Sequence, residues 1–377
     1  MTDQPLLFTP IDLRELRLKN RVVVSPMATY SAQGGFATDW HVTHVGKLAA
    51  GGAGLVFVEQ SSVSVQGRIT HGCLGIWDDA QTAGHAKLAT LIHDLNAKAA
   101  IQIAHGGRKA SSQRPWEGGE PLGQADVAAR GEGPWDIAAS SSIPFDSGWP
   151  APHMMTGEDI DHVVDDYRAA FRRARAAGYD VVELHCAHGY LMHSFLSPLA
   201  NNRNDAYGGS RDNRMRLPLK IAGIMREEWP AHLPALVRIS SVDGVDIGWS
   251  IDDSVAFSAE LKKLGIDMID CSSGGMKLPR GNSLVSRTPG FQVPFAERIQ
   301  REAKIPTIAV GLIREADYAE SILQNGQATL IALGRELLWN PNWPAQAALQ
   351  LGCDPEWEGW PDQYGWWLKR RTVQQGR

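Results

Sequence analysis

Cysteine is scarce in this sequence of 377 residues, which contains only four. Cys73, Cys186, Cys271 and Cys353 lie far apart, without the close pairs that zinc or iron–sulfur ligation uses. The first residues carry neither a basic start nor an apolar stretch of secretory length, so we expect a cytoplasmic protein without structural disulfides.

An excess of positive charge is also missing. The chain has 37 Lys and Arg residues against 42 Asp and Glu, a net charge of -5, and a pI near 6.2. This charge balance gives no positive electrostatic potential that would attract a polyanion. Neither nucleic acid nor an acidic membrane surface is therefore expected as the main partner. No segment approaches about 18 uninterrupted apolar residues, the length of a membrane-spanning helix. The expected partner is a small molecule.

The sequence does contain a repeated alternation of short β-branched runs with stretches of helical spacing, the pattern of parallel βαβ units. The predicted strands are Val22–Ser25, Gly54–Gln60, Ala100–His105, Val181–His185, Ala235–Ser241, Met268–Ser272, Thr307–Val310 and Thr329–Leu333. The predicted helices are Asp39–Ala53, Gln81–Ala99, Glu158–Ala177, Asn213–Glu228, Ile251–Leu264, Val293–Ala303, Glu315–Gln324 and Asn342–Leu351.

Eight such units in this order predict an α/β protein built as a single (β/α)8 TIM barrel over residues 1–377. A doubly wound sheet is the alternative, but it would need a glycine-rich turn after the first strand, where Ser-Pro-Met-Ala-Thr-Tyr stands instead. The long stretch 108–155 follows the third strand and is expected to cap the barrel mouth, and residues 352–377 form a C-terminal extension.

Polar residues stand at the predicted carboxyl ends of the strands, where barrel enzymes carry out their chemistry. After the last two strands, Gly311, Gly334 and Arg335 fit a phosphate held by backbone N–H groups. The alternative is that the glycines only turn the chain and Arg335 pairs with a carboxylate. Arg238 lies on an otherwise apolar strand, so its charge needs a buried carboxylate, a bound anion or an anionic cofactor edge.

The segment His185-Cys-Ala-His188-Gly-Tyr190 allows a metal interpretation, because two histidines three residues apart could reach one ion. In an extended strand they would point to opposite faces, so they converge only if the chain bends after His185, as Gly189 suggests. Glu183 is the only local candidate for a third ligand. A metal-dependent hydrolase using His185 and His188 therefore stays open as the alternative function, beside histidines that are merely structural.

Several segments, taken together, resemble the flavin-dependent old yellow enzymes over nearly the whole chain, in particular their thermophilic-type and xenobiotic-reductase branch. The matching segments are Lys19-Asn20-Arg21, Ser25-Pro26-Met27 with Tyr30, Gln102-Ile-Ala-His105-Gly-Gly-Arg108, His185-Cys-Ala-His188-Gly-Tyr190-Leu, Phe195-Leu-Ser-Pro198, Asn202-Arg203, Asp205-Ala-Tyr207-Gly-Gly-Ser210, Asn213-Arg214 and Gly334-Arg335-Glu336.

The resemblance implies an NADPH dehydrogenase and ene-reductase with non-covalently bound FMN, reduced by NADPH or NADH. Gln102 is similar to the residue that pairs with the flavin pyrimidine edge, and Arg238 to the cation beside N1 and O2. The residues implied to contact the cofactor are Ser25, Pro26, Met27, Ala28, Gln60, Gln102, Arg238, Gly311, Gly334 and Arg335.

For the substrate, the resemblance implies an electron-poor alkene such as an enone, with nitro compounds or nitrate esters as further acceptors. His185 and His188 are similar to the pair that donates hydrogen bonds to the activating oxygen. Tyr190 resembles the acid that protonates the alkene after hydride transfer from flavin N5, and Tyr30 would line the same pocket.

The chain departs from the branch pattern at two positions. Ala28 replaces a common cysteine, and Gln60 stands where a small residue is usual. We therefore expect a different flavin potential and substrate range. The C-terminal Trp366, Trp367, Arg370 and Arg371 resemble ends that reach a neighbouring subunit's active site, which implies a homodimer or homotetramer; packing on the chain's own barrel is the alternative.

Overall fold

Eight parallel strands close into a barrel in the computed structural model of the chain, which describes residues 4–277, 283, 285–354 and 356–374. Hydrogen bonds join them in the order β3, β13, β12, β11, β10, β9, β6 and β4, and a further pairing of β3 with β4 closes the ring. The strands are β3 Val22–Val24, β4 Leu55–Ser62, β6 Lys98–Ala104, β9 Val181–Cys186, β10 Ala235–Ser240, β11 Met268–Ser272, β12 Thr307–Ala309 and β13 Leu330–Leu333. The predicted (β/α)8 barrel is confirmed.

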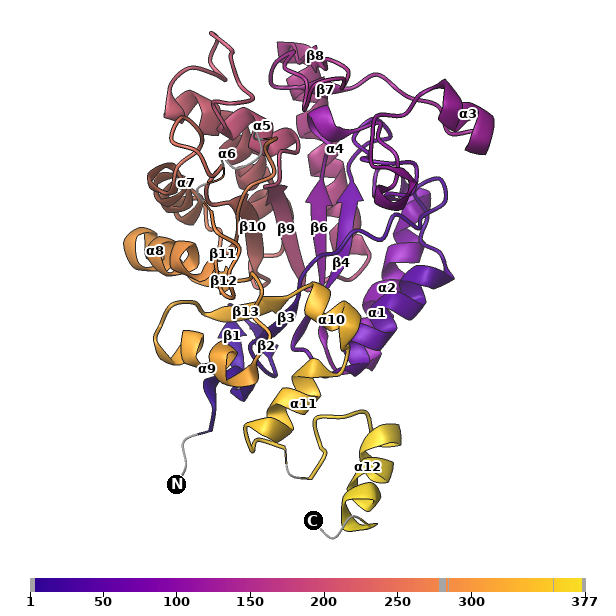
Figure 1. Cartoon of the computed structure of the whole chain (residues 1–377), viewed down its shortest axis with the longest axis vertical. Coiled ribbons are helices and arrows are strands. Elements are labelled where there is room, and N and C mark those ends of the chain that lie inside the picture. The colour runs from indigo at the N-terminus through magenta and orange to yellow at the C-terminus, as the bar shows by residue number, and fades with distance from the viewer. Residues whose placement is uncertain (1–3, 278–282, 284, 355, 375–377) are drawn as a thin grey trace.

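Helices that follow the strands cover the outside of the barrel (Figure 1). They are α1 Asp39–Ala50, α2 Thr82–Asp94, α4 Gly157–Ala176, α6 Arg211–Glu228, α7 Ile251–Lys263, α8 Val293–Ala303, α9 Ala316–Gln324 and α11 Trp343–Gln350. Alternate residues of a strand face opposite sides. Leu55 and Phe57 of β4 accordingly join the inner apolar cluster, while Val56 and Val58 join the cluster that the helices cover.

A hairpin that the sequence reading did not predict precedes the barrel. It consists of β1 (Ile11–Leu13) and β2 (Leu16–Leu18), which pair antiparallel. Leu13, Leu16 and Leu18 are buried in the same cluster as the inward-facing strand residues. The hairpin therefore belongs to the core inside the barrel, away from the carboxyl ends where β4, β6 and β9 point in Figure 1.

The predicted helix Gln81–Ala99 was too long. The helix α2 ends at Asp94, and Asn96 takes the left-handed conformation with φ of 56°. The Ala97 N–H then donates to the Ile92 carbonyl at 3.2 Å, a closure typical of helix C-termini. The last two residues of the prediction instead begin β6.

Shorter elements occupy the connections and the C-terminal region. They are α3 Gln124–Arg130, α5 Leu191–Leu196, α10 Arg335–Trp339, α12 Asp362–Gln374, β5 Leu74–Gly75, β7 Ala138–Ala139 and β8 His153–Met154. In Figure 1 the segment 108–155, with α3, β7 and β8, lies beyond the carboxyl ends of β6 and β9, and α12 lies at the other end of the molecule. Of the C-terminal extension 352–377, residues 355 and 375–377 lie outside the described part.

Within the described residues, the helices are all too short or too polar to cross a membrane.

Candidate active site

A cavity of about 590 Å³ opens where β3, β10, β11, β12 and β13 end. It brings together all the predicted cofactor residues except two; the predicted residues in its lining are Ser25, Pro26, Met27, Ala28, Arg238, Gly311, Gly334 and Arg335. These come from four separate strands or the loops after them, so the grouping depends on closure of the barrel.

Two cavity residues present buried polar atoms without a partner among the described residues, Ser25 Oγ and Arg238 Nε. Arg238 Nη1 lies 3.2 Å from Asp270 Oδ2, so the guanidinium is paired on one edge and open on the other. Burial raises the pKa of Asp270, and the Arg238 charge opposes this effect. An anionic, hydrogen-bonding group such as a flavin edge fits this unpaired donor.

The cavity lining does not include Gln102 and Gln60. Gln102 Nε2 donates to Glu183 Oε1 at 2.8 Å inside the barrel, where burial and the Asp270 charge raise the pKa of Glu183 well above its usual value. Gln60 is buried, its Nε2 lies 3.1 Å from Cys73 Sγ, and its Oε1 has no partner among the described residues.

His185, His188 and Tyr190 converge beside the cavity. The ring centroids of His185 and His188 are 5.1 Å apart, and those of His185 and Tyr190 are 5.2 Å apart. The chain turns after β9 because His188 and Gly189 both have positive φ, 62° and 78°. A side chain at Gly189 would place its Cβ 2.4 Å from the Gly275 carbonyl oxygen, so the turn requires glycine.

The two imidazoles are held differently. The Ala187 N–H donates to His185 Nδ1 at 3.1 Å, which leaves the proton of the neutral ring on Nε2. His188 Nε2 lies 2.7 Å from Ser272 Oγ, a residue that also lines the cavity. Burial lowers the pKa of both histidines well below the usual value, and the Arg238 charge adds to this effect. Both rings are therefore neutral near pH 7.

Burial raises the pKa of Tyr190 to about 12, and the neighbouring Tyr30 hydroxyl opposes this effect. The pKa of Tyr30 is raised by burial and by the neighbouring Tyr190. Lys109 Nζ donates to the His188 carbonyl at 3.0 Å and lies 4.9 Å from the centroid of the Tyr190 ring. Burial lowers the pKa of Lys109 to about 8.

The part of the chain that the structure describes contains no cluster of three or more His, Cys, Asp or Glu residues placed to hold a metal ion. The local candidate for a third ligand, Glu183, instead accepts the Gln102 amide. The geometry gives no support to the hydrolase alternative.

Sequence reasoning missed several residues of the site. Lys109 lies four residues after the end of the predicted strand Ala100–His105 and could have been found from its position. Asp270 could not, because it faces Arg238 only through the pairing of β10 with β11. The cavity residues to which the sequence assigned no cofactor role are Ser272, Phe291, Gln292, Val310, Leu312, Ile313, Arg314, Ala332, Leu333, Glu336 and Leu338.

Comparison with known proteins agrees with this geometry. Residues 6–353 match the model of the NADH:flavin oxidoreductase / NADH oxidase family. The chain is 43% identical over 365 residues to an NADPH dehydrogenase of Geobacillus thermodenitrificans, covering 96% of this chain and 98% of that protein. It is 42% identical to an NADPH dehydrogenase of Bacillus subtilis, covering 92% and 96%. A structure of a morphinone reductase mutant with tetrahydroNAD superposes with a TM-score of 0.74 at 25% identity, covering 92% of this chain and 91% of that one.

Proposed function

The chain belongs to the NADH:flavin oxidoreductase / NADH oxidase family and is an FMN-dependent oxidoreductase of the old yellow enzyme type, and we propose that it reduces electron-poor alkenes. The main support for this reaction is the convergence of His185, His188 and Tyr190 beside the cavity that contains Arg238.

The cavity residues would hold FMN, which when bound accepts a hydride from NADPH and passes one to the alkene. Arg238 would place its open guanidinium edge against the pyrimidine end of the ring system, with Gln102 beside it. Gly311, Gly334 and Arg335 would bind the phosphate, and the segment 25–28 would lie along the cofactor. Gln60 would approach from β4.

The two histidines would bind the activating oxygen of the alkene. His185 offers the N–H at Nε2, because its Nδ1 already accepts the Ala187 N–H. His188 would donate through Nδ1, with Ser272 donating to its Nε2. Neutral imidazoles are good donors here because they polarise the oxygen without the cost of a buried charge.

Tyr190 would protonate the α-carbon. Its pKa of about 12 keeps the hydroxyl protonated near neutral pH, and the Tyr30 hydroxyl lies near enough to influence that pKa. Tyr30 would line the same pocket.

NADPH is the reductant for which the relatives are named, so it is the first to test. Enones would be the main acceptors, with nitro compounds or nitrate esters as further ones. We also propose that α12 packs on a second copy of the chain in a homodimer or homotetramer, because Trp366 and Trp367 are 52% and 66% exposed in the single chain.

Anaerobic stopped-flow spectroscopy tests the reaction. The purified yellow protein should bleach with NADPH and regain its colour with 2-cyclohexenone. Tyr190→Phe should slow this reoxidation roughly a hundredfold, because the general acid is lost, while reduction by NADPH keeps its rate. Tyr207→Phe, with its ring against Phe195, is the matched control and should change neither rate. A wild-type protein that no alkene reoxidises faster than buffer does would overturn the proposal.

A further inference from the structure

Tyr30 has an unusual backbone conformation for an aromatic residue. Its φ is 49°, in the left-handed region that non-glycine residues rarely occupy. Such conformations persist when their surroundings hold them in place. The neighbours of Tyr30 therefore decide where its side chain lies.

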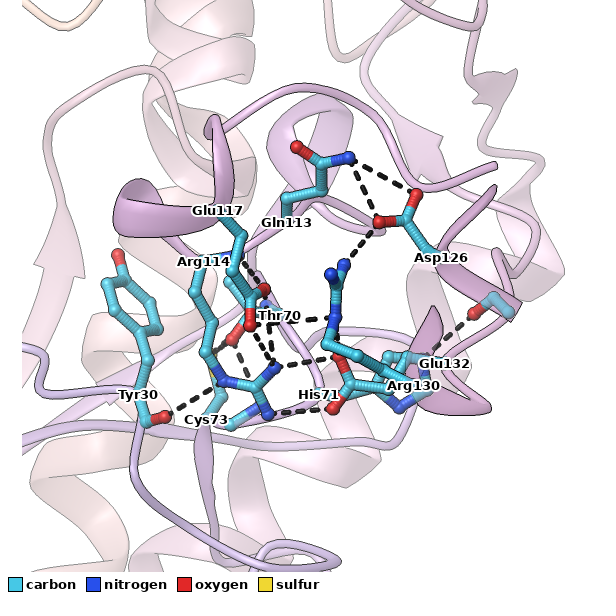
Figure 2. A network of polar contacts seen from close by, with 12 residues as sticks. Tyr30, Thr70, His71, Cys73, Gln113, Arg114, Glu117, Asp126, Arg130 and Glu132 are labelled. Carbon is cyan, nitrogen blue, oxygen red and sulfur yellow. Dashed lines mark hydrogen bonds and ion pairs between the residues drawn. The ribbon is translucent and has the colours of Figure 1, made fainter. Parts of the chain in front are cut away.

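The Tyr30 carbonyl is held by Arg114, which belongs to the long segment 108–155. Arg114 Nε donates to the Tyr30 oxygen at 3.2 Å (Figure 2). Gly72 packs against the same oxygen; a Cβ there would lie 2.1 Å from the oxygen and 3.0 Å from Arg114 Nε. The carbonyl is thus enclosed, and Arg114 is the side chain that donates to it.

Two carboxylates fix the other edges of the Arg114 guanidinium. Glu132 accepts from Nη1 and Nη2, each at 2.7 Å, and Glu117 accepts from Nη1 at 3.2 and 3.4 Å. The hydrogen bonds that Arg114 donates to Glu132 raise the pKa of Arg114. A planar guanidinium can donate hydrogen bonds to both carboxylates and to the carbonyl at the same time. A lysine ammonium at position 114 could not reproduce this geometry.

A second arginine belongs to the same network without contacting Tyr30. Arg130 pairs with Asp126, and its Nε lies 3.4 Å from Glu132 and 3.5 Å from Glu117. Figure 2 shows Arg130 on the side of Arg114 away from Tyr30, next to Asp126 and Glu132. The network therefore supplies its own control, an arginine with similar ion pairs that, unlike Arg114, does not donate to the Tyr30 carbonyl.

The other end of Tyr30 reaches the proposed proton donor. Its hydroxyl lies close enough to the Tyr190 hydroxyl for each group to shift the pKa of the other, and its ring lies 6.2 Å from that of Trp116 in an edge contact. Residues 114 and 116 thus contact Tyr30 at the carbonyl and at the ring. A displacement of Tyr30 would also displace the hydroxyl that lies next to that of Tyr190.

We propose that Arg114 is a positioning residue for the alkene half-reaction: it fixes Tyr30 and, through the Tyr30 hydroxyl, aligns Tyr190 for proton transfer. This inference rests on the proposed function of Tyr190. If Arg114 has this role, the segment 108–155 influences proton transfer from Tyr190 through the Arg114 side chain.

The test compares Arg114→Met with Arg130→Met in the FMN-loaded enzyme reduced by dithionite. Reoxidation by 2-cyclohexenone should slow roughly tenfold to a hundredfold in Arg114→Met, the size expected for a misplaced reacting group. Reoxidation by O2 takes its proton from solvent and needs no protonation of a carbon by Tyr190, so it should stay within about twofold of wild type. Arg130→Met should leave both rates within about twofold, and Arg114→Lys should fall between wild type and Arg114→Met.

Hydrogen exchange provides a readout independent of turnover. The Thr29 and Ala32 amides, which donate to Glu59 and to the Gly72 carbonyl, should exchange faster in Arg114→Met and not in Arg130→Met. If Arg114→Met does not fold, Arg114→Lys is compared with Arg130→Met in the same measurements.

A double variant separates positioning from a general loss of structure. In a Tyr30→Phe background the link to Tyr190 is already absent, so adding Arg114→Met should slow the alkene reaction by less than about twofold. Equal losses in Arg114→Met and Arg130→Met, or a full additional loss in the Tyr30→Phe background, would overturn the inference. Failure of wild type to be reoxidised by the alkene would instead overturn the proposed function.

Discussion

Arg238 and Asp270 face each other across neighbouring strands with Nη1 and Oδ2 3.2 Å apart, while Nε of the same guanidinium has no partner among the described residues. The pair explains how a permanent charge is tolerated inside the barrel. The unpaired Nε can donate a hydrogen bond to a ligand, and this hydrogen bond is strongest when the ligand atom is negatively charged.

Removal of this charge should lower the midpoint potential of the bound FMN. Arg238→Met loses a cation beside the site where negative charge develops on reduction, and we expect a fall of roughly 30–60 mV for the two-electron couple. Arg238→Lys is the control and should recover most of the potential, since it keeps the charge. Spectroelectrochemical titration measures both variants. An unchanged potential in Arg238→Met would show that the guanidinium does not face the flavin.

Introduction of a thiol at Ala28 should raise the flavin potential. Ala28 lines the cavity, and a weak S–H donor there would favour the reduced, more negative state by roughly 10–20 mV. Ala28→Ser, which has similar size but no sulfur, is the matched control. Equal potentials in Ala28→Cys and wild type would remove the reason to link this departure to redox tuning.

The rate of alkene reduction should depend on Lys109. Burial lowers the pKa of its ammonium from 10.5 to about 8, so in the folded protein the cation below the Tyr190 ring is lost as pH rises through about 8. Tyr190, with a pKa of about 12, stays protonated over this range. The cation favours release of the Tyr190 proton, so the rate should fall above this pH.

A pH profile of the alkene half-reaction checks this prediction. Lys109→Met should remove the inflection near pH 8, whereas Lys263→Met, at a side chain that is 70% exposed, should retain it. The same lowered pKa means that the folded state binds fewer protons than the unfolded state between about 8 and 10.5, so this group makes folding more favourable as pH rises there. A thermal melting series over this range should therefore show a smaller loss of stability in wild type than in Lys109→Met.

Removal of residues 360–377 should change the assembly. The exposed Trp366 and Trp367 on α12 would be lost, and with them the apolar area that we propose packs on a second copy. We expect a smaller assembly by light scattering and a higher KM for the alkene. Trp367→Ala should weaken assembly less. A folded, truncated protein with the same mass distribution and kinetics as wild type would contradict the proposal that α12 packs on a second copy of the chain.

Much of the fold could be read from the sequence because the signals are local. All eight predicted barrel strands are present, and the predicted helix Val293–Ala303 matches α8 at both ends. The error at Gln81–Ala99 is also instructive. Ile92, Leu95 and Ala99 keep a helical spacing from α2 into β6, and the left-handed turn at Asn96 separates the helix from the strand there.

The candidate site was predictable in part for the same reason. Residues directly after predicted strands, such as Ser25, Gly311 and Gly334, line one cavity because parallel strands of a barrel end on the same side. Gln60 and Gln102 were expected there as well, yet their amides face Cys73 and Glu183. Which side a strand residue faces near a bulge, such as the one between Val58 and Ser61, depends on the pairing and not on the residue's own sequence position.

The sequence by itself determined the order of strands and helices, the placement of polar residues at strand ends and, through its motifs, the family. Those properties depend on spacing along the chain. The tertiary structure alone decided that Asp270 neutralises Arg238 and that Arg114, 84 residues away, holds the Tyr30 carbonyl. Contacts of this kind depend on strand register and on the path of a long loop, because they join residues that are distant in sequence and come together only when the barrel closes.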